Sequence, residues 1–321
     1  MKNFTAVSDV SDVKALVKRA LEIKQEGPGS TIGQHKTLVL LFFNPSLRTR
    51  LSTEKAGRNL GMQVITMNAG EGWKLEFEEG AVMNGDSAEH VKEAAGVISR
   101  YADIIGVRSF PAFQNREEDY SEKVLRQFMR YASVPVVNLE SATLHPLQSL
   151  TDLITIEEYK TTARPKVVLS WAPHPRILPQ AVANSFVEWM KVSDVELVVT
   201  HPEGYELAPP FAEGVRVEYD QAKAFEGADF VYAKNWSPYY RYGEILSQDP
   251  EWTISARQMS RTNNAKFMHC LPVRRNVVVE DSVLDHPDSI ILQQAGNREV
   301  AAQAVLERLL LEAATPRRGG C

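Results

Sequence analysis

Cysteine is nearly absent from this sequence, and its absence bears on both the compartment and the stability of the chain. Only Cys270 and Cys321 occur among 321 residues, so a disulfide scaffold is excluded and a reducing compartment is indicated. A chain of this length buries about three-quarters of its unfolded surface, so its core needs no covalent cross-links. The length suggests two domains of ordinary size.

Long apolar runs and an excess of basic residues are lacking as well. No stretch approaches the roughly 20 apolar residues of a membrane-spanning helix, and the first residues, MKNFTAVSDV, contain no apolar core of a signal peptide. Lysine and arginine number 36 against 41 aspartate and glutamate residues, which gives a net charge of −5. A protein that binds nucleic acid through its phosphates needs a basic surface. We therefore expect a cytoplasmic protein with no membrane or nucleic-acid partner.

Glycine-rich phosphate-binding motifs are also missing. No Gly-x-Gly-x-x-Gly follows the early apolar runs, and the glycines of residues 27–37 miss the Walker A spacing. Dinucleotide and P-loop chemistry are therefore disfavoured. The few histidines and cysteines do not cluster at the spacing of metal ligands, so neither a metal nor a cofactor is expected.

Short apolar runs alternate with longer amphipathic segments along the chain. Continuous apolar strands separated by helices are typical of parallel sheets covered on both faces. One sheet of about eleven strands is possible, but two smaller sheets suit the length better. The expected strands are 36–43, 63–67, 103–107, 134–139, 166–171, 195–200, 215–219, 229–233, 266–270 and 289–292, and the expected helices are 50–60, 88–100, 122–131, 148–159, 178–191 and 298–311.

The predicted fold is therefore α/β, with two doubly wound parallel-sheet domains linked by helices. The first domain is expected at residues 1–142, completed by a C-terminal helix at 297–314, and the second at 143–296. The segment at 140–145 is the expected crossover. Residues 315–321 are expected to form a disordered tail.

The sequence Pro-Ser-Leu-Arg-Thr-Arg at residues 45–50 stands where the first strand ends and a helix should begin. Ser46 is expected to cap that helix, whose first amide groups lack intrahelical partners. Two arginines in a first helical turn oppose the helix dipole. They are explained if an anion binds there, held by backbone N–H groups, hydroxyls and guanidinium groups. The alternative is a solvated helix start with incidental arginines.

Two further motifs stand at expected element ends. His145, in His-Pro-Leu-Gln, precedes a helix and could donate to an oxygen that gains charge during a reaction. His269 and Cys270, in His-Cys-Leu-Pro, lie at the carboxyl end of a strand, where open α/β sheets bind ligands. Adjacent strand residues point to opposite faces, so a His–Cys dyad is not expected. Cys270 is instead expected to be a polarisable wall or backbone contact of the site, or a buried structural cysteine.

These three motifs, in this order and at these separations, resemble those of the transcarbamylase family over nearly the whole chain. The resemblance implies transfer of a carbamoyl group from carbamoyl phosphate to an amine, mainly by positioning and electrostatic stabilisation of an oxyanion. It implies that Arg108, His145 and Cys270 are catalytic residues, with Gln148 at the carbamoyl amino group. The residues implied to bind carbamoyl phosphate are Ser46, Leu47, Arg48, Thr49, Arg50, Trp73, Arg108, His145, Gln148, Cys270, Leu271 and Arg298.

The acceptor amine is indicated by a departure from the ornithine enzymes of this family. Lys234 stands in the region where those enzymes carry an aspartate that holds a free α-amino group. A lysine repels an α-ammonium but suits an acylated nitrogen beside a carboxylate, which resembles the N-acyl-ornithine branch. In that branch Trp73 would reach the site of a neighbouring subunit, within a homotrimer. The residues implied to bind the acylornithine are Glu140, His174, Lys234, Arg274 and Ala88.

The acyl group is expected to be succinyl. Ala88 stands where acetyl-using enzymes tend to have a glutamate, and Val278 where they have a lysine. Loss of a negative charge favours a second carboxylate on the substrate. The resemblance thus implies carbamoylation of the δ-amine of N-succinyl-L-ornithine, giving N-succinyl-L-citrulline and phosphate, in arginine biosynthesis. Acetylornithine is the alternative, since Ala88 is not the proline expected in succinyl-using enzymes; a non-catalytic carbamoyl phosphate-binding paralogue is a further, disfavoured alternative.

Overall fold

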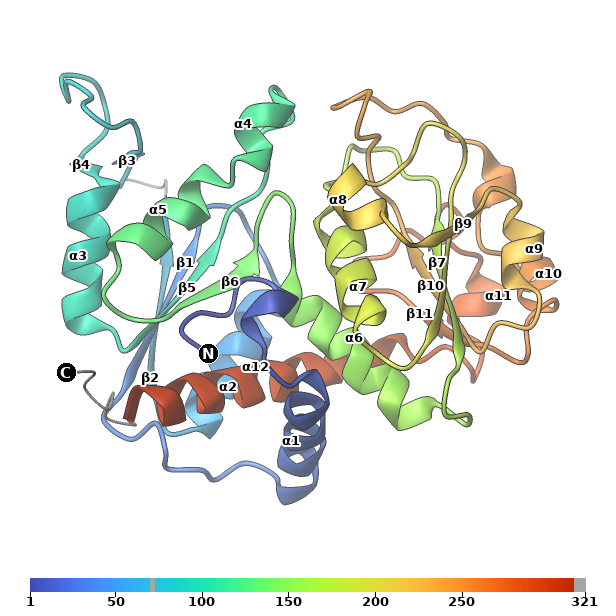
Figure 1. The fold of residues 1–321 in the computed structure, drawn as a ribbon, viewed down its shortest axis with the longest axis horizontal. Coiled ribbons are helices and arrows are strands. Elements are labelled where there is room, and N and C mark those ends of the chain that lie inside the picture. The colour runs from blue at the N-terminus through green and yellow to red at the C-terminus, as the bar shows by residue number, and fades with distance from the viewer. Residues whose placement is uncertain (70–72, 315–321) are drawn as a thin grey trace. The chain divides into compact units, whose positions relative to one another are not determined.

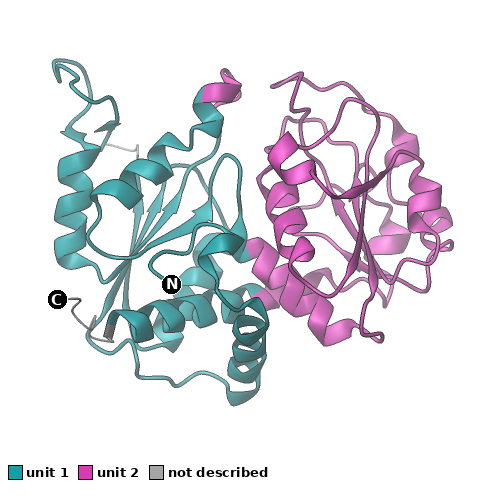
Figure 2. Ribbon diagram, in the orientation of Figure 1, with its two compact units in different colours: residues 1–111, 118–147, 298–321 teal, residues 112–117, 148–297 magenta. Residues whose placement is uncertain are grey.

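The computed structural model describes residues 1–69 and 73–314, which fall into two compact units. Unit 1 comprises Met1–Pro111, Glu118–Leu147 and the chain from Arg298 onward, and unit 2 comprises Ala112–Glu117 and Gln148–Asn297 (Figure 2). The sequence predicts domain boundaries after residues 142 and 296, whereas the two units divide after Leu147 and after Asn297, with Ala112–Glu117 also in unit 2. The tail expected at 315–321, with Cys321, lies outside the described residues.

Unit 1 is built on a parallel sheet with the strand order β2-β1-β5-β6. Its strands are β1 (Thr37–Phe42), β2 (Gln63–Asn68), β5 (Ile104–Arg108) and β6 (Val136–Glu140). A short parallel pair, β3 (Leu75–Glu76) with β4 (Glu89–His90), lies outside this sheet. The unit 1 helices are α1 (Val13–Glu26), α2 (Arg48–Asn59), α3 (Val91–Tyr101), α5 (Lys123–Tyr131) and most of α12 (Ile291–Ala314), with a 3-10 turn at Val7–Asp9.

Alternating side chains of β1 explain why helices cover both faces of this sheet (Figure 1). Val39 and Leu41 are buried in one cluster with side chains of α3 and α5. Leu38 points to the other face, where α2 packs so closely that a Cβ built on Gly57 would lie 3.0 Å from Leu38 Cδ2. Glycine therefore allows α2 to approach the sheet. Since both faces are buried, the strand is apolar throughout, as predicted.

Unit 2 repeats this architecture with a parallel sheet in the order β11-β10-β7-β8-β9. Its strands are β7 (Lys166–Trp171), β8 (Glu196–Thr200), β9 (Arg216–Glu218), β10 (Phe230–Lys234) and β11 (Lys266–Met268). Its helices are α4 (Arg116–Tyr120), shared with unit 1, α6 (Pro146–Tyr159), α7 (Ala181–Lys191), α8 (Pro209–Ala212), α9 (Gln221–Phe225), α10 (Ala256–Met259) and α11 (Asp281–Leu284), with a 3-10 turn at Pro250–Trp252. Phe186 of α7 contacts Tyr232 of β10 edge to face, with ring centroids 4.7 Å apart.

The predicted class, α/β with two parallel-sheet domains linked by helices, is confirmed. Three local predictions were wrong. Residues 89–90, expected within a helix at 88–100, form the strand β4, and α3 begins at Val91. Residues 289–292 are not a strand: Ser289 forms an isolated bridge to Phe267, and α12 begins at Ile291. A short apolar run does not distinguish a strand from the start of a buried helix. Ser46 is not the cap of α2, because Leu47 occupies that position and makes no side-chain capping bond.

The parallel strands place chemistry-bearing residues at one edge of each sheet. Arg108 ends β5 and Glu140 ends β6 in unit 1, while Lys234 ends β10 in unit 2. Ligands bind at the carboxyl edge in open α/β sheets. Among residues 1–69 and 73–314, no helix combines the length and apolar character needed to cross a bilayer.

Candidate active site

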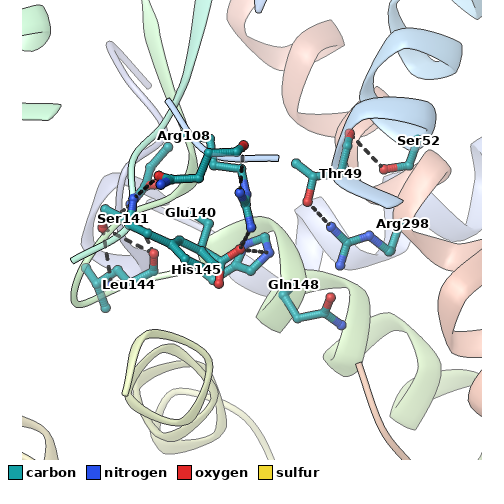
Figure 3. A network of polar contacts seen from close by, with 12 residues as sticks. Thr49, Ser52, Arg108, Glu140, Ser141, Leu144, His145, Gln148 and Arg298 are labelled. Carbon is teal, nitrogen blue, oxygen red and sulfur yellow. Dashed lines mark hydrogen bonds and ion pairs between the residues drawn. The ribbon is translucent and has the colours of Figure 1, made fainter. Parts of the chain in front are cut away.

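Arg108 is the centre of the unit 1 site. Its Nη2 donates to Glu140 Oε2 at 3.0 Å (Figure 3). Its Nη1 donates to the carbonyl oxygens of Asn44 and Pro45 at 3.0 and 2.8 Å. The guanidinium also lies over the Phe110 ring, 4.1 Å from its centroid. Arg108 is only 5% exposed, and its Nε is buried with no hydrogen-bond partner within the described part of the chain. A buried donor of this kind is costly unless a ligand satisfies it.

A register irregularity between β5 and β6 places Glu140 at this arginine. Val107 pairs with Asn138, whereas the next residue, Arg108, pairs with Glu140, so Leu139 is skipped. Such bulges re-aim side chains and are common beside active sites. Glu140 Oε2 also lies 3.6 Å from His145 Nε2. The structure thus brings together Arg108, Glu140 and His145.

Glu122 holds the loop between Glu140 and His145, a role that the sequence analysis missed. Its Oε1 accepts hydrogen bonds from Ser141 Oγ and from the Thr143 backbone, both at 2.7 Å. Burial raises the pKa of Glu122, and hydrogen bonds from Thr143 and Ser141 oppose that rise. Its left-handed backbone, with φ of 53° at the cap of α5, points to a special local role.

The predicted phosphate-binding motif lies at the start of α2. Thr49 is buried, and its Oγ1 accepts a hydrogen bond from Arg298 Nη2 at 2.7 Å, so α12 contributes to this end of the helix (Figure 3). Arg50 is held by Glu54, with Nε and Oε1 3.3 Å apart. Ser46 and Arg48 are half-buried, and Leu47 is 65% exposed. The hydroxyls and arginines expected at an anion site therefore gather here.

Unit 2 holds the other residues implied at the carbamoyl group. Gln148 is buried in α6, and its Nε2 donates to Asp152 Oδ1 at 2.7 Å. Cys270 is half-buried, two residues beyond the end of β11. Leu271 has a left-handed φ of 57°, and its N–H donates to His269 Nδ1 at 2.8 Å. His269 is engaged by its own loop, so the structure forms no His–Cys dyad through this nitrogen.

Three of the predicted acceptor-binding residues converge in unit 2. Arg274 Nε donates to His174 Nε2 at 3.1 Å, and His174 Nδ1 lies 3.0 Å from the Arg176 carbonyl oxygen. Burial lowers the pKa of His174, and the charges of Lys234 and Arg274 lower it further. The Arg176 backbone N–H also donates to His174 Nδ1 at 3.0 Å, so the backbone of Arg176 fixes the orientation of the imidazole. His174 then orients Arg274, and Lys234 supplies a second cation, an arrangement suited to a carboxylate.

Trp73 and Ala88 lie in unit 1. The Trp73 indole donates to Glu89 Oε2 at 3.1 Å, and its ring packs partly buried against the apolar cluster under α3 and α5. Ala88 is exposed, and its N–H donates to the Lys74 carbonyl oxygen at 2.9 Å. Lys74 also forms an ion pair with Asp86, which ties the residue just before β3 to the segment before β4.

Within the described ranges, no three His, Cys, Asp or Glu side chains gather in a way that could hold a metal ion.

Comparison with known proteins agrees with this arrangement in both units. Residues 2–158 match the carbamoyl-P binding domain of aspartate/ornithine carbamoyltransferase, and residues 179–309 match the Asp/Orn binding domain of the same family. N-succinylornithine carbamoyltransferase of Bacteroides thetaiotaomicron is 58% identical over 314 residues, covering 97% of this chain and 99% of that protein. N-acetylornithine carbamoyltransferase of Xanthomonas axonopodis pv. citri is 36% identical, covering 98% of each chain.

A solved structure is similar over the same length. It is a mutant of N-acetyl-L-ornithine transcarbamylase complexed with carbamyl phosphate and N-succinyl-L-norvaline, and it is 36% identical with a TM-score of 0.90. The match covers 96% of this chain and 100% of that one. Both domains of the family are matched in order along the chain, and the relatives align with nearly its whole length. Together with the arginine, histidine and glutamine motifs, these matches show that this chain belongs to the aspartate/ornithine carbamoyltransferase family.

Proposed function

We propose that this chain transfers the carbamoyl group of carbamoyl phosphate to the δ-amine of N-succinyl-L-ornithine, giving N-succinyl-L-citrulline and phosphate in arginine biosynthesis. The observation that carries this proposal is the 58% identity, over 97% of the chain, to a protein named N-succinylornithine carbamoyltransferase. We place carbamoyl phosphate in unit 1 and the acylornithine in unit 2, in the order of the two matched family domains.

The phosphate of carbamoyl phosphate is bound by residues 46–50, Arg108 and Arg298. The Arg108 guanidinium is already fixed on two carbonyl oxygens and has a buried Nε without a partner in the described structure. It needs little reordering to donate to the phosphate and to the carbamoyl oxygen. Pre-oriented charged donors stabilise phosphate as it leaves and the oxyanion as it forms.

The δ-amine attacks the carbamoyl carbon, the C–O bond to phosphate breaks, and the amine proton passes to the departing phosphate. His145 donates to the carbamoyl oxygen, and Glu140, 3.6 Å from His145, accepts from the amine N–H. Gln148, Cys270 and Leu271 contact the carbamoyl amino group. No side chain forms a covalent intermediate, because positioning and electrostatic stabilisation supply the rate enhancement.

Lys234 and Arg274 bind the carboxylate and acyl oxygen of the acceptor, with His174 orienting Arg274. Ala88 replaces a glutamate whose charge would repel the second carboxylate of a succinyl group. Acetylornithine remains the second candidate acceptor, because relatives named for it are 36% identical over nearly the full length.

We further propose a cytoplasmic homotrimer in which Trp73 completes the site of a neighbouring subunit. Support comes from the position of Trp73 beside β3 and β4, outside the main sheet of unit 1.

The test is phosphate release by the purified protein from carbamoyl phosphate, with and without N-succinyl-L-ornithine. An enzyme releases phosphate and forms succinylcitrulline in equal amounts. A non-catalytic paralogue binds carbamoyl phosphate but gives only the background rate of its decay, which would contradict the proposal.

A further inference from the structure

Asp152 is a fully buried carboxylate at the centre of a polar network in unit 2. It lies one helical turn after Gln148 in α6 and has an exposure of 0%. Its Oδ1 accepts from Gln148 Nε2 at 2.7 Å and from Gln294 Nε2 of α12 at 2.6 Å. A buried carboxylate is retained only when such donors compensate its desolvation.

The same network continues to the loop that carries Cys270 and Leu271. Gln294 Oε1 accepts the His269 backbone N–H at 2.9 Å. His269 Nδ1 in turn accepts the Leu271 N–H at 2.8 Å. Two arms therefore start at Asp152: one ends on Gln148, and the other ends on the Cys270–Leu271 loop.

The chemistry of a carboxylate sets the orientation of both glutamines. Because Asp152 Oδ1 accepts from both glutamines, each glutamine turns its NH₂ group toward Asp152 and its Oε1 away. For Gln294, the Oε1 atom then meets the His269 N–H. For Gln148, Oε1 becomes the end of the amide that is presented as an acceptor. A flipped Gln148 would place oxygen against oxygen and present a donor instead.

We infer that Asp152 is a positioning residue for carbamoyl transfer: it orients the Gln148 amide and holds the Cys270–Leu271 loop, so that both accept hydrogen bonds from the carbamoyl NH₂ group. This inference rests on the proposed function, in which these residues contact that group. The amino group of carbamoyl phosphate only donates, so its site needs acceptors. The Asp152 carboxylate thus helps to turn hydrogen-bond acceptors toward this group from two places, Gln148 in α6 and the Cys270–Leu271 loop.

The test is steady-state kinetics of Asp152→Leu, in which the side chain has the same number and connectivity of heavy atoms but no hydrogen-bond acceptor. The KM for carbamoyl phosphate should rise about 10- to 100-fold, the effect typical of removing a supporting polar partner. The KM for the acylornithine should stay within about threefold of wild type. Asp152→Asn keeps one acceptor oxygen and should fall between wild type and the leucine variant.

Thr155→Val is the matched control. Asn297 Nδ2 donates to Thr155 Oγ1 at 3.0 Å, so this pair joins α12 to α6 three residues further along each helix than Gln294 and Asp152. Its loss should lower stability without raising the KM for carbamoyl phosphate. A purely structural role of Asp152 would give the same pattern as the control, with fewer active molecules and unchanged KM values.

A double variant separates action through Gln148 from a general effect. In a Gln148→Ala background, Asp152→Leu should raise the KM for carbamoyl phosphate less than it does in the wild-type background, because only the support of the Cys270–Leu271 loop is then left to lose. Full additivity, or an unchanged KM for carbamoyl phosphate in Asp152→Leu, would overturn the inference. If the leucine variant does not fold, the asparagine variant in the same cycle decides. Turnover by the wild-type protein in these assays tests the proposed function separately. A failure of the proposed function can therefore be told apart from a failure of the inference about Asp152.

Discussion

Arg108 is paired in register with Glu140, not with Leu139, because the ladder between β5 and β6 skips one residue beyond Val107. The two side chains meet at 3.0 Å and are 6% and 10% exposed. A buried pair of this kind gives little net stability, but losing one partner leaves a costly unpaired charge. The arginine is thereby held ready at the sheet edge, beside His145.

Replacing Arg108 by alanine should nearly abolish the use of carbamoyl phosphate. Each lost hydrogen bond to a charged group costs about 1.5–3 kcal/mol, so two such contacts correspond to a fall of roughly 10²- to 10⁴-fold in kcat/KM. The exposed Arg126→Ala in α5 is the control and should behave as wild type. Near-normal kinetics in Arg108→Ala, measured on folded protein, would show that this site is wrongly assigned.

Position 88 should help to choose the acyl group. Ala88→Glu adds a negative charge and should depress kcat/KM for succinylornithine by roughly 10- to 100-fold, since at this exposed position the repulsion of a like charge is expected to cost about 1.4–2.8 kcal/mol. Ala88→Gln has the same size without the charge and should lose much less. Equal losses in both variants would mean that size, not charge, matters at this position.

Shared sites predict complementation between two inactive proteins. Each site is expected to contain Arg108 of one subunit and Trp73 of its neighbour. Arg108→Ala and Trp73→Ala therefore remove residues that different subunits contribute to the same site. After random exchange of subunits in an equal mixture, about a quarter of the sites should hold both native residues. Activity should recover toward that level. A mixture that exchanges subunits, as shown by mass spectrometry of tagged chains, yet stays inactive would place Trp73 in its own subunit's site.

Glu188 in α7 should make stability depend on pH. Burial raises the pKa of Glu188 to about 6, from an ordinary 4.5, and its Oε2 is buried with no hydrogen-bond partner in the described chain. The folded state therefore binds the proton more tightly than the unfolded state. The resulting stability is fully present below pH 4.5 and is lost as the pH rises through 6. Glu188→Gln should therefore gain up to about 1 kcal/mol relative to wild type at pH 7.5, after solvent screening is allowed for.

Denaturant unfolding at pH 4.5 and pH 7.5 checks this prediction. The difference between Glu188→Gln and wild type should grow with pH. A difference that is the same at both pH values would mean that Glu188 titrates as an exposed carboxyl.

The strands of the two main sheets were predictable from sequence because several are continuous apolar runs buried on both faces, as β1 and β7 are. The short pair β3 and β4 was not predicted. The prediction failed at residues 289–292, where the apolar residues begin a buried helix instead of a strand. Ser46 has a favourable capping side chain, yet α2 begins two residues later. The capping preference of serine is overridden there by the direction in which the chain leaves β1.

Site residues were predictable from the sequence only where they lie within a recognisable motif. The pairing of Arg108 with Glu140 depends on a skipped residue in the ladder, which has no sequence pattern. The Gln148–Asp152 contact is visible as an i, i+4 spacing on a helix, but its second donor, Gln294, is 142 residues away along the chain. The role of Glu122 depends on a left-handed residue and a distant loop.

The most direct test of the central claim is the carbamoylation rate of N-succinyl-L-ornithine, N-acetyl-L-ornithine and L-ornithine, measured side by side with saturating carbamoyl phosphate. We predict the highest kcat/KM for the succinyl compound, a lower value for the acetyl compound and the lowest for ornithine, whose α-ammonium Lys234 repels. A higher kcat/KM for acetylornithine or ornithine than for succinylornithine would contradict the proposed acceptor.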